Sequence, residues 1–389
     1  MDTPDTSAAG VATPPPAAAP PFRRLKIAFV VHDYHRSGGH SRYVTELATR
    51  FAKEHEVHVF ANRIADDGTA GIHFHHVPAW RANAFTTVLS FAVPVTLQVG
   101  RDFDVVHSQG FCGLVGNVFT AHMCNRAWHS ALLKLDEGAT LRESVFNKVT
   151  GALEHALYRF ARKSPVIAVS DRVGQDLVKY YHCPSPMHVI YHGTDLETFS
   201  PETRRRYRDQ ARAQYGIPKD EFVFLYVGDL RKGARRCMQA LTQVDKGLLL
   251  CVAATDPIPY RQFAKDLGVE QRVIFAGHTK QVERAFAAGD AFLLPTPYDS
   301  FAMVVSEAMG CGLPVVVSRE AGVAELIRHG VNGLLLEDVT SHSELALHMR
   351  SLQDREWAEA LGRAGRRTVE PLSWDAVAAQ TMAVYKEVL

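Results

Sequence analysis

Hydrophobic positions in this chain form short β-branched runs that alternate with longer stretches of helical periodicity. Residues 26–31 and 56–60 are such runs, and residues 41–53 between them carry apolar side chains at the spacing of an amphipathic helix. Continuous apolar strands separated by helices are typical of a parallel sheet that is covered on both faces. The beginning of the chain therefore predicts an α/β domain of this kind.

The same alternation continues to the end of the chain, with one polar interruption. Residues 144–162 predict a long helix, and residues 191–212, which end in a basic stretch, predict a connection between two domains. Further strands are expected at residues 104–107, 117–121, 165–169, 221–227, 248–253, 273–276, 291–294 and 314–317. We therefore predict a first α/β domain over residues 23–200, a second over residues 201–372 and a terminal helix over residues 373–389.

Two segments bear on the location of the protein. Residues 1–22 are dominated by Ala, Pro, Thr and Asp, which predicts a disordered tail and neither a signal peptide nor a membrane span. Residues 88–99 are the most apolar later window, but they are too short to cross a bilayer and they contain Pro94. We expect a buried helix there, with a surface that touches a membrane as the alternative.

Composition narrows the class of protein. With 389 residues, of which 47% are hydrophobic and 22% charged, the chain has the make-up of a globular protein with two ordinary domains. Its formal net charge of +1 gives no support for a nucleic-acid partner. Six cysteines without CxxC spacing predict reduced thiols of a cytoplasmic protein, and the 19 histidines lack an HExxH pattern, so no metal site is expected.

Residues 297–317 carry the strongest chemical signal. They place two carboxylates, Asp299 and Glu307, eight positions apart across a strand-to-helix junction. A turn that opens a helix leaves backbone N–H groups unpaired, which makes an anion site, and the carboxylates can hold hydroxyl groups on either side of it. Phosphate flanked by sugar hydroxyls is the outline of a nucleotide-sugar, so the segment predicts a donor pocket. The alternative is a buried α/β crossover in which Glu307 is an ordinary cap or a solvated residue.

This segment resembles the signature of the retaining glycosyltransferases of family 4, which have the GT-B fold of two Rossmann-like domains that face a central cleft. The signature has two acidic residues separated by seven others, usually with Glu first, and here Asp299 is one methylene shorter. The resemblance is closest to a branch of lipopolysaccharide-core glucosyltransferases. It implies that Glu307 holds the donor ribose hydroxyls and that Asp299 contacts the transferred sugar, assisted by the backbone amides of Phe301, Ala302 and Met303.

Other segments resemble the same family at matching places. Gly38 and Gly39 follow the first strand and would bring backbone N–H groups to phosphate or sugar, although the glycines alone fit an ordinary tight turn equally well. Arg231 and Lys232 would neutralise a pyrophosphate without metal, with a solvated basic turn as the alternative. His122, after a strand, would hydrogen-bond the transferred sugar, with a structural histidine as the alternative.

Three further features of the first and last segments follow from the resemblance. His107 resembles a family position near the acceptor cleft. Asp102 and Asp104 form a DxD, which binds metal in another class of glycosyltransferase, but they match a segment of this family and no metal is expected there. The helix over residues 373–389 is expected to cross back to the first domain, as it typically does in GT-B enzymes.

The resemblance implies a metal-independent, retaining glycosyltransferase that needs no cofactor. Such an enzyme would move a hexose from a nucleoside-diphosphate sugar, with a UDP-hexose as the leading choice, to a hydroxyl of a glycan or glycolipid acceptor in bacterial envelope polysaccharide biosynthesis. The expected location is the cytoplasm, with peripheral contact at the inner face of the plasma membrane. Two alternatives stay open: a GT-B nucleotide-sugar epimerase, and a non-catalytic partner that binds sugar nucleotides.

Overall fold

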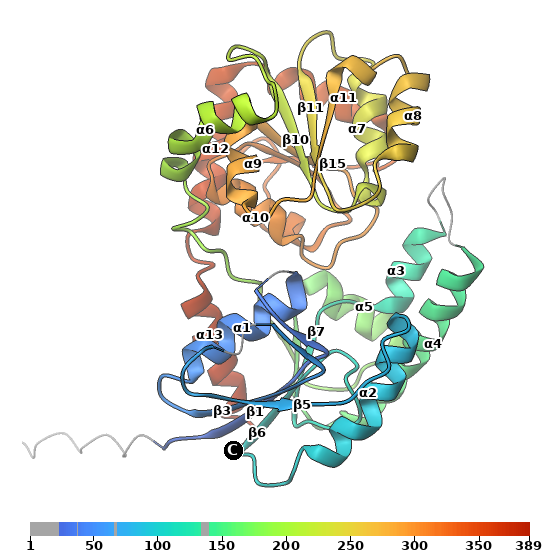
Figure 1. Cartoon of the computed structure of the whole chain (residues 1–389), viewed down its shortest axis with the longest axis vertical. Helices are drawn as coiled ribbons and strands as arrows, with labels where there is room; N and C mark the ends of the chain where they lie inside the picture. Colours follow the sequence, from blue (N-terminus) through green and yellow to red (C-terminus); the bar gives the residue numbers. More distant parts are fainter. Residues whose placement is uncertain (1–22, 37, 66–67, 134–139) are drawn as a thin grey trace, which may run out of the picture.

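The computed structural model describes residues 23–36, 38–65, 68–133 and 140–389, and Figure 1 shows its two lobes. Each lobe contains one parallel sheet with helices packed against it, which confirms the prediction of two Rossmann-like α/β domains. The tail predicted for residues 1–22 lies outside the described residues.

The first lobe is built on a seven-stranded parallel sheet. Its order is β5 (Ile72–His76), β3 (Glu56–Ala61), β1 (Lys26–Val30), β6 (Val105–Gln109), β7 (Val118–Ala121), β8 (Val166–Ala168) and β9 (Met187–Val189). Its helices are α1 (Gly39–Phe51), α2 (Ala84–Gln98), α3 (Asn125–Leu132), α4 (Leu141–Phe160) and α5 (Asp171–Tyr181). Two short strands, β2 (Asp33–Tyr34) and β4 (Arg63–Ile64), form a separate parallel pair.

Strand β1 shows how the sequence covers both faces of this sheet. Successive side chains of a strand point to opposite faces. Ile27 and Phe29 pack into the hydrophobic cluster that contains residues of α1, whereas Ala28 and Val30 pack into the cluster that contains Phe91 of α2. These four side chains are fully buried, which is why the strand reads as an unbroken apolar run after Lys26.

The second lobe repeats this design with a six-stranded parallel sheet. Its order is β12 (Val273–Gly277), β11 (Leu248–Val252), β10 (Val223–Val227), β13 (Ala291–Leu294), β14 (Val315–Ser318) and β15 (Leu334–Leu336). Its helices are α6 (Pro201–Gln214), α7 (Ala234–Leu241), α8 (Ile258–Asp266), α9 (Val282–Ala288), α10 (Met303–Gly310), α11 (His342–Ser351) and α12 (Arg355–Val369). Three short 3₁₀ helices are η1 (Leu230–Lys232), η2 (Glu270–Arg272) and η3 (Gly322–Leu326).

The basic stretch at residues 204–212, which the sequence pattern assigned to the connection between domains, is part of helix α6 of the second lobe. Ser200 caps this helix by accepting from the backbone N–H of Thr203, and Pro201 occupies its first turn. Every fourth residue of the helix, from Arg204 through Arg212, is an arginine that faces the start of β13.

The last helix, α13 (Trp374–Tyr385), returns to the first lobe and lies beside α1 (Figure 1). Trp374 and Tyr385 are buried in the same cluster as Phe29 of β1. The phenol oxygen of Tyr385 lies 2.7 Å from Nδ1 of His107, whose Nε2 lies 2.6 Å from the hydroxyl of Thr120. His107 is fully buried, and these two contacts join α13 to the sheet.

Helix α2 departs in part from the expectation of a buried helix. Phe91 and Val95 are buried, but Val93 and Leu97 are 64% and 81% exposed on the other side of the helix. Pro94 is accommodated inside the helix. Among the described residues, no helix is long and apolar enough to cross a membrane.

Candidate active site

A cavity of about 470 Å³ opens between the two lobes. Its walls include the segments that directly follow β7, β10 and β13, so the carboxyl ends of these parallel strands face it. This edge of an open α/β sheet is where ligands usually bind. Eight of the predicted site residues line the cavity, namely Gly39, His122, Arg231, Lys232, Asp299, Phe301, Ala302 and Met303. Gly38 and Glu307 are not part of its lining.

The N-terminus of α10 is open toward this cavity. Ala302 precedes the helix in a left-handed conformation, with φ 70° and ψ 65°, and no side chain caps the helix. Phe301, Ala302, Met303 and Val304 all line the cavity. An uncapped N-terminus presents unpaired N–H groups and the positive end of the helix dipole, so this turn suits an anion.

Helix α1 presents a second uncapped N-terminus from the opposite lobe. Gly38 precedes the helix with φ 86°, a conformation that glycine adopts without a steric penalty, and its side-chain-free position leaves the helix start accessible. Gly39, the first residue of the helix, lines the cavity. Neither α1 nor α10 has an acidic residue in its first turn to offset the positive end of its dipole.

Asp299 and Lys232 form an ion pair on the second lobe's side of the cavity. Lys232 Nζ lies 2.7 Å from Asp299 Oδ2, and the side chains are 33% and 16% exposed. Asp299 Oδ1 accepts from the backbone N–H of Phe301 at 3.3 Å, which ties the carboxylate to the turn that opens α10. Asp299, which is one methylene shorter than the usual Glu, is thus held by Lys232 and by the backbone N–H of Phe301, next to the N-terminus of α10.

Arg231 joins the two lobes across the mouth of the cavity. Its guanidinium donates to both oxygens of Asp229 and to Oε1 of Glu143, on α4 of the first lobe, at 3.1 Å. Burial acts to raise the pKa of Asp229, but the hydrogen bonds and charge of Arg231, together with a hydrogen bond from Thr255, hold that pKa below its usual value. In this conformation the positive charge of Arg231 is therefore shared between two carboxylates.

Glu307 lies behind the cavity and is paired with Arg42 of α1. Arg42 Nη1 lies 2.6 Å from Glu307 Oε1, and the glutamate side chain is only 7% exposed. Burial raises the pKa of Glu307, while the charge and hydrogen bond of Arg42 act in the opposite direction. The sequence motif identified Glu307, but Arg42 lies 265 residues away, and no local pattern indicated that the two would pair.

Three histidines stack on the first lobe's side of the cavity. The ring centroid of His122 lies 4.2 Å from that of His40 and 5.6 Å from that of His192. His122 Nε2 lies 2.9 Å from Oε1 of Gln109, so with Nε2–H as donor its buried, unpartnered Nδ1 is left as an acceptor. Burial holds the pKa of His122 well below 6.5 and lowers that of His192 to about 3, so both rings are neutral near pH 7.

Several lining residues carried no functional signal in the sequence. His40 directly follows the paired glycines, and His192 lies in the predicted connection between the two domains. Trp128 and Tyr298 also line the cavity, and Lys232 Nζ lies 5.8 Å from the centroid of the Trp128 ring. An aromatic residue inside a helix is usually part of a core, so Trp128 could not have been singled out.

In the Asp-x-Asp motif before β6, the carboxylate of Asp104 is bound by groups of the protein. Asp104 accepts from Arg23 at 2.5 Å and from the backbone N–H of Lys26 at 2.8 Å, which ties the start of β1 to the start of β6. Within the described parts of the chain, no group of three or more His, Cys, Asp or Glu side chains could hold a metal ion.

Comparison with known proteins agrees with this geometry. Residues 37–198 match the sequence model of Glycosyltransferase Family 4, and residues 207–368 match that of Glycosyl transferases group 1. D-inositol 3-phosphate glycosyltransferase 1 of Catenulispora acidiphila is 28% identical over 404 residues, with 91% of each chain covered.

Solved structures show the same fold. WaaG, a glycosyltransferase involved in lipopolysaccharide biosynthesis, superposes with a TM-score of 0.76 at 21% identity over 92% of this chain and 99% of that one. Anabaena HepE in complex with UDP-glucose gives a TM-score of 0.70 at 19% identity, over 94% and 100% of the two chains. Two Rossmann-like lobes with a cleft at the carboxyl edges of their sheets define the GT-B class of protein. Within that class, the chain belongs to family 4 of the glycosyltransferases.

Proposed function

We propose that this glycosyltransferase is a retaining, metal-independent enzyme that moves a hexose from a nucleoside-diphosphate sugar to an acceptor hydroxyl. The observation that carries the proposal is the uncapped N-terminus of α10, flanked by Lys232 and Asp299 and open to the interlobe cavity. A diphosphate needs positive charge and N–H donors, whereas a sugar needs acceptors for its hydroxyls. Both kinds of group meet at this turn.

The leaving diphosphate would be stabilised by groups from both lobes. Lys232 and the backbone N–H groups of residues 302–304 supply positive charge and donors from the second lobe, and Gly39 supplies a donor from the first. Arg231 would turn from Glu143 to the diphosphate as the donor enters, because an exposed ion pair of this kind contributes only about 0–1 kcal/mol. These cations and helix ends would take the place of a metal ion.

Asp299 and Glu307 would bind the sugar and the ribose of the donor, on either side of the diphosphate. Asp299 would accept from hydroxyls of the transferred sugar, next to the diphosphate. Glu307 would hold ribose hydroxyls through Oε2 while Arg42 keeps Oε1. His122, neutral and with Nδ1 free to accept, would orient a further sugar hydroxyl from the first lobe.

Retention of configuration would follow from attack on the same face of the sugar as the leaving group. The acceptor oxygen would bond to the anomeric carbon as the bond to the diphosphate oxygen breaks, and the leaving phosphate would take the acceptor proton. Closure of the lobes would exclude water from this step.

We further propose which donor and which acceptor the enzyme uses. A UDP-hexose donor is favoured because a solved structure with this fold, HepE, holds UDP-glucose. A glycan or glycolipid acceptor of the bacterial cell envelope is favoured because WaaG acts in lipopolysaccharide biosynthesis. The exposed apolar side chains Val93 and Leu97 of α2 would suit peripheral contact with a membrane that carries such an acceptor.

The test is nucleotide release from a panel of UDP-, GDP- and ADP-sugars with chelator present. We expect slow hydrolysis of one donor that chelator does not affect, and its loss in Glu307→Ala but not in Glu270→Ala, an exposed glutamate in η2. Conversion of the donor without nucleotide release would point instead to an epimerase. Absence of both binding and turnover with every donor would contradict the proposal.

A further inference from the structure

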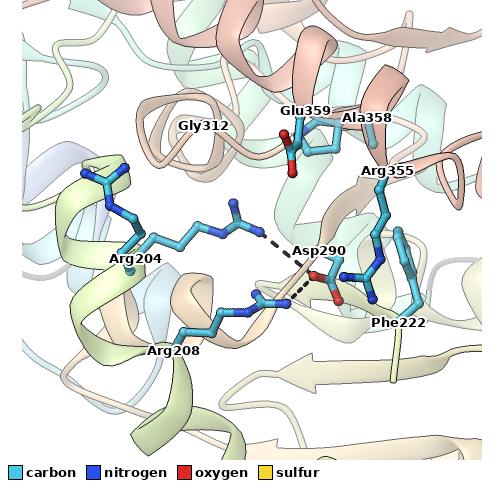
Figure 2. Close-up of a pocket in the computed structure, with 10 residues that line it drawn as sticks. Arg204, Arg208, Phe222, Asp290, Gly312, Arg355, Ala358 and Glu359 are labelled. Carbon is cyan, nitrogen blue, oxygen red and sulfur yellow. Dashed lines mark hydrogen bonds and ion pairs between the residues drawn. The ribbon is translucent and has the colours of Figure 1, made fainter. Parts of the chain in front are cut away.

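A second cavity, of about 240 Å³, lies in the second lobe (Figure 2). It lies at the edge of the sheet opposite to the active-site cleft. Among the residues that line it, Phe222, Asp290 and Pro314 directly precede β10, β13 and β14. The cleft, in contrast, is lined by residues that follow β10 and β13. The two cavities are therefore separated by the length of the strands.

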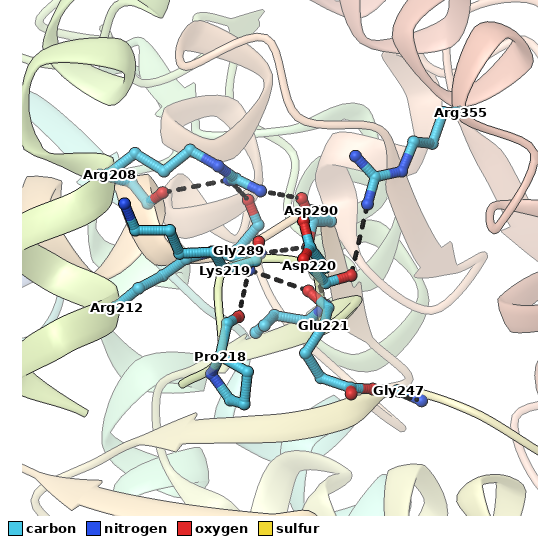
Figure 3. A network of polar contacts seen from close by, with 12 residues as sticks. Arg208, Arg212, Pro218, Lys219, Asp220, Glu221, Gly247, Gly289, Asp290 and Arg355 are labelled. Carbon is cyan, nitrogen blue, oxygen red and sulfur yellow. Dashed lines mark hydrogen bonds and ion pairs between the residues drawn. The ribbon is translucent and has the colours of Figure 1, made fainter. Parts of the chain in front are cut away.

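Two arginines of α6 anchor this helix to the sheet. Arg208 Nη2 lies 2.5 Å from Asp290 Oδ1, and Arg212 Nη2 lies 2.6 Å from Asp290 Oδ2, so each oxygen of the carboxylate has a short ion pair. Arg212 is 2% exposed, and its Nη1 also donates to three backbone carbonyls, those of residues 218, 219 and 221 (Figure 3). A structural role accounts for both of these arginines.

Arg204 and Arg355, which line the cavity, have no comparable carboxylate. Arg204 Nη2 is 4.0 Å from the already paired Asp290 and donates to a backbone carbonyl, while its Nε is buried without a hydrogen-bond partner. Arg355, the first residue of α12, reaches only the carbonyl of Asp220, at 3.5 Å. Figure 2 shows Arg204 and Arg355 extending toward the cavity from opposite sides.

The cavity therefore carries an excess of positive charge. Its lining contains the carboxylates of Asp290 and Glu359 and four arginines, which are Arg204, Arg205, Arg208 and Arg355. Asp290 is paired with Arg208 and Arg212, Glu359 with Arg363 at 3.5 Å, and Arg205 with Glu202 at 2.8 Å. Arg204 and Arg355 are left without a close carboxylate. Burial, and then the neighbouring Arg208, lower the pKa of Arg204, which shows that its surroundings disfavour the charge. An anion in the cavity would relieve this cost.

We propose that this cavity binds a small phosphate-bearing anion, held between Arg204 of α6 and Arg355 of α12. The planar fork of a guanidinium matches the oxygens of a phosphate, and two such forks from different helices would grip one group. The volume of 240 Å³ is below the roughly 300–1,000 Å³ of sites for drug-sized ligands, so the anion is compact: free phosphate or a small phosphate monoester. This site is independent of the function proposed for the cleft.

The test is the saturable stabilisation of the full chain by phosphate, measured by thermal unfolding in phosphate-free buffer with sodium chloride matched in ionic strength. We expect Arg355→Gln to raise the apparent Kd for inorganic phosphate about tenfold or more, because a charged hydrogen bond is lost. Arg367→Gln, an exposed arginine on the same helix outside the cavity, should leave the Kd unchanged. Glu359→Gln should lower it, because this change removes a negative charge from the wall.

Phosphate could also enter the donor cleft, so the same titration is made with Lys232→Gln. Stabilisation that survives Lys232→Gln but is weakened by both Arg355→Gln and Arg204→Gln supports the proposal. Stabilisation equal to that by sodium chloride, or lost in Lys232→Gln and retained in Arg355→Gln, would overturn it. A hexose phosphate that binds more tightly than inorganic phosphate would identify a monoester as the ligand, whereas equal affinities would identify free phosphate.

Discussion

Arg42 of the first lobe and Glu307 of the second form an ion pair of 2.6 Å that crosses the lobe interface behind the cleft. Other polar contacts reinforce this interface. Glu325 accepts from the backbone N–H groups of Asp171 and Arg172 at the N-terminus of α5, and the hydroxyl of Ser170 donates to the carbonyl of Ser300. The carboxylate that the sequence motif assigns to the donor is thus also part of the contact between the lobes.

Replacing Arg42 with methionine should destabilise the protein strongly. The change leaves the buried Glu307 carboxylate without its partner, and breaking a buried pair in this way costs about 3–5 kcal/mol. Urea unfolding of Arg42→Met, Glu307→Leu and the double variant measures the coupling. We expect the double variant to recover most of the lost stability; losses that simply add would contradict the pairing.

Removing the charge of Asp299 should slow catalysis without unfolding the protein. Asp299→Asn keeps the shape of the side chain but weakens its bond to Lys232 and to sugar hydroxyls, at a cost of about 1.5–3 kcal/mol, or one to two decades in kcat/KM. The measurement is kcat/KM for the donor, with the urea midpoint as the check on folding. Full activity of Asp299→Asn would show that the carboxylate is not used.

Stability should fall as the pH drops below about 6.5. Burial lowers the pKa of His32 to about 4 and those of His107 and His192 to about 3, so the unfolded chain binds protons that the folded chain does not. Each such histidine contributes a slope of up to about 1.4 kcal/mol per pH unit. Buried Glu154, whose pKa is raised to about 7, acts in the opposite sense between pH 4.5 and 7, but the histidines outnumber it.

Urea unfolding at intervals between pH 5.5 and 7.5 measures this dependence. His192→Asn should reduce the slope by about one proton, and Glu154→Gln should make it steeper, because each variant removes one titrating group. A stability that is flat or rises toward pH 5.5 would show that these histidines are not buried in their neutral form.

Glycine in place of Ala302 should stabilise the protein. A left-handed conformation costs an L-residue such as Ala302 about 1–2 kcal/mol, and glycine avoids this cost. The greater conformational entropy of glycine in the unfolded chain offsets only part of this gain. We expect a gain of about 0.5–1 kcal/mol in urea unfolding. Ala308→Gly, in the interior of the same helix, is the matched control and should destabilise instead. A loss of stability in Ala302→Gly would contradict the strained backbone.

Local patterns were sufficient for most of the fold. Residues 291–294 were predicted as a strand and form β13 with the same bounds, because both faces of that strand are buried and the run is entirely apolar. The long helix expected at residues 144–162 begins earlier, at Leu141, because Thr140 and Glu143 form a capping box. For residues 88–99 the sequence left a buried helix and an exposed surface as alternatives, since an apolar run does not show which side packs, and α2 has one buried and one exposed face.

Spacing alone could join only the site residues that lie in one segment, whereas Gly39, His122, Arg231 and Lys232 were assigned through the resemblance to the family. Asp299 and the residues that open α10 are neighbours in the chain, and their spacing indicated a common role. The pairing of Arg231 with Glu143, and the approach of α12 to α6 that forms the second cavity, depend on tertiary packing between distant segments. No local pattern encodes such contacts.

The return of α13 to the first lobe affects the order in which the two lobes can fold during synthesis. Trp374 and Tyr385 fill the same core as Phe29, so the first lobe cannot complete that core while it emerges from the ribosome. Tyr43 packs against Trp374 and His107 contacts Tyr385, so these contacts form only after the second lobe has been synthesised. The first lobe is translated first, but its hydrophobic core is completed only by the last helix of the chain.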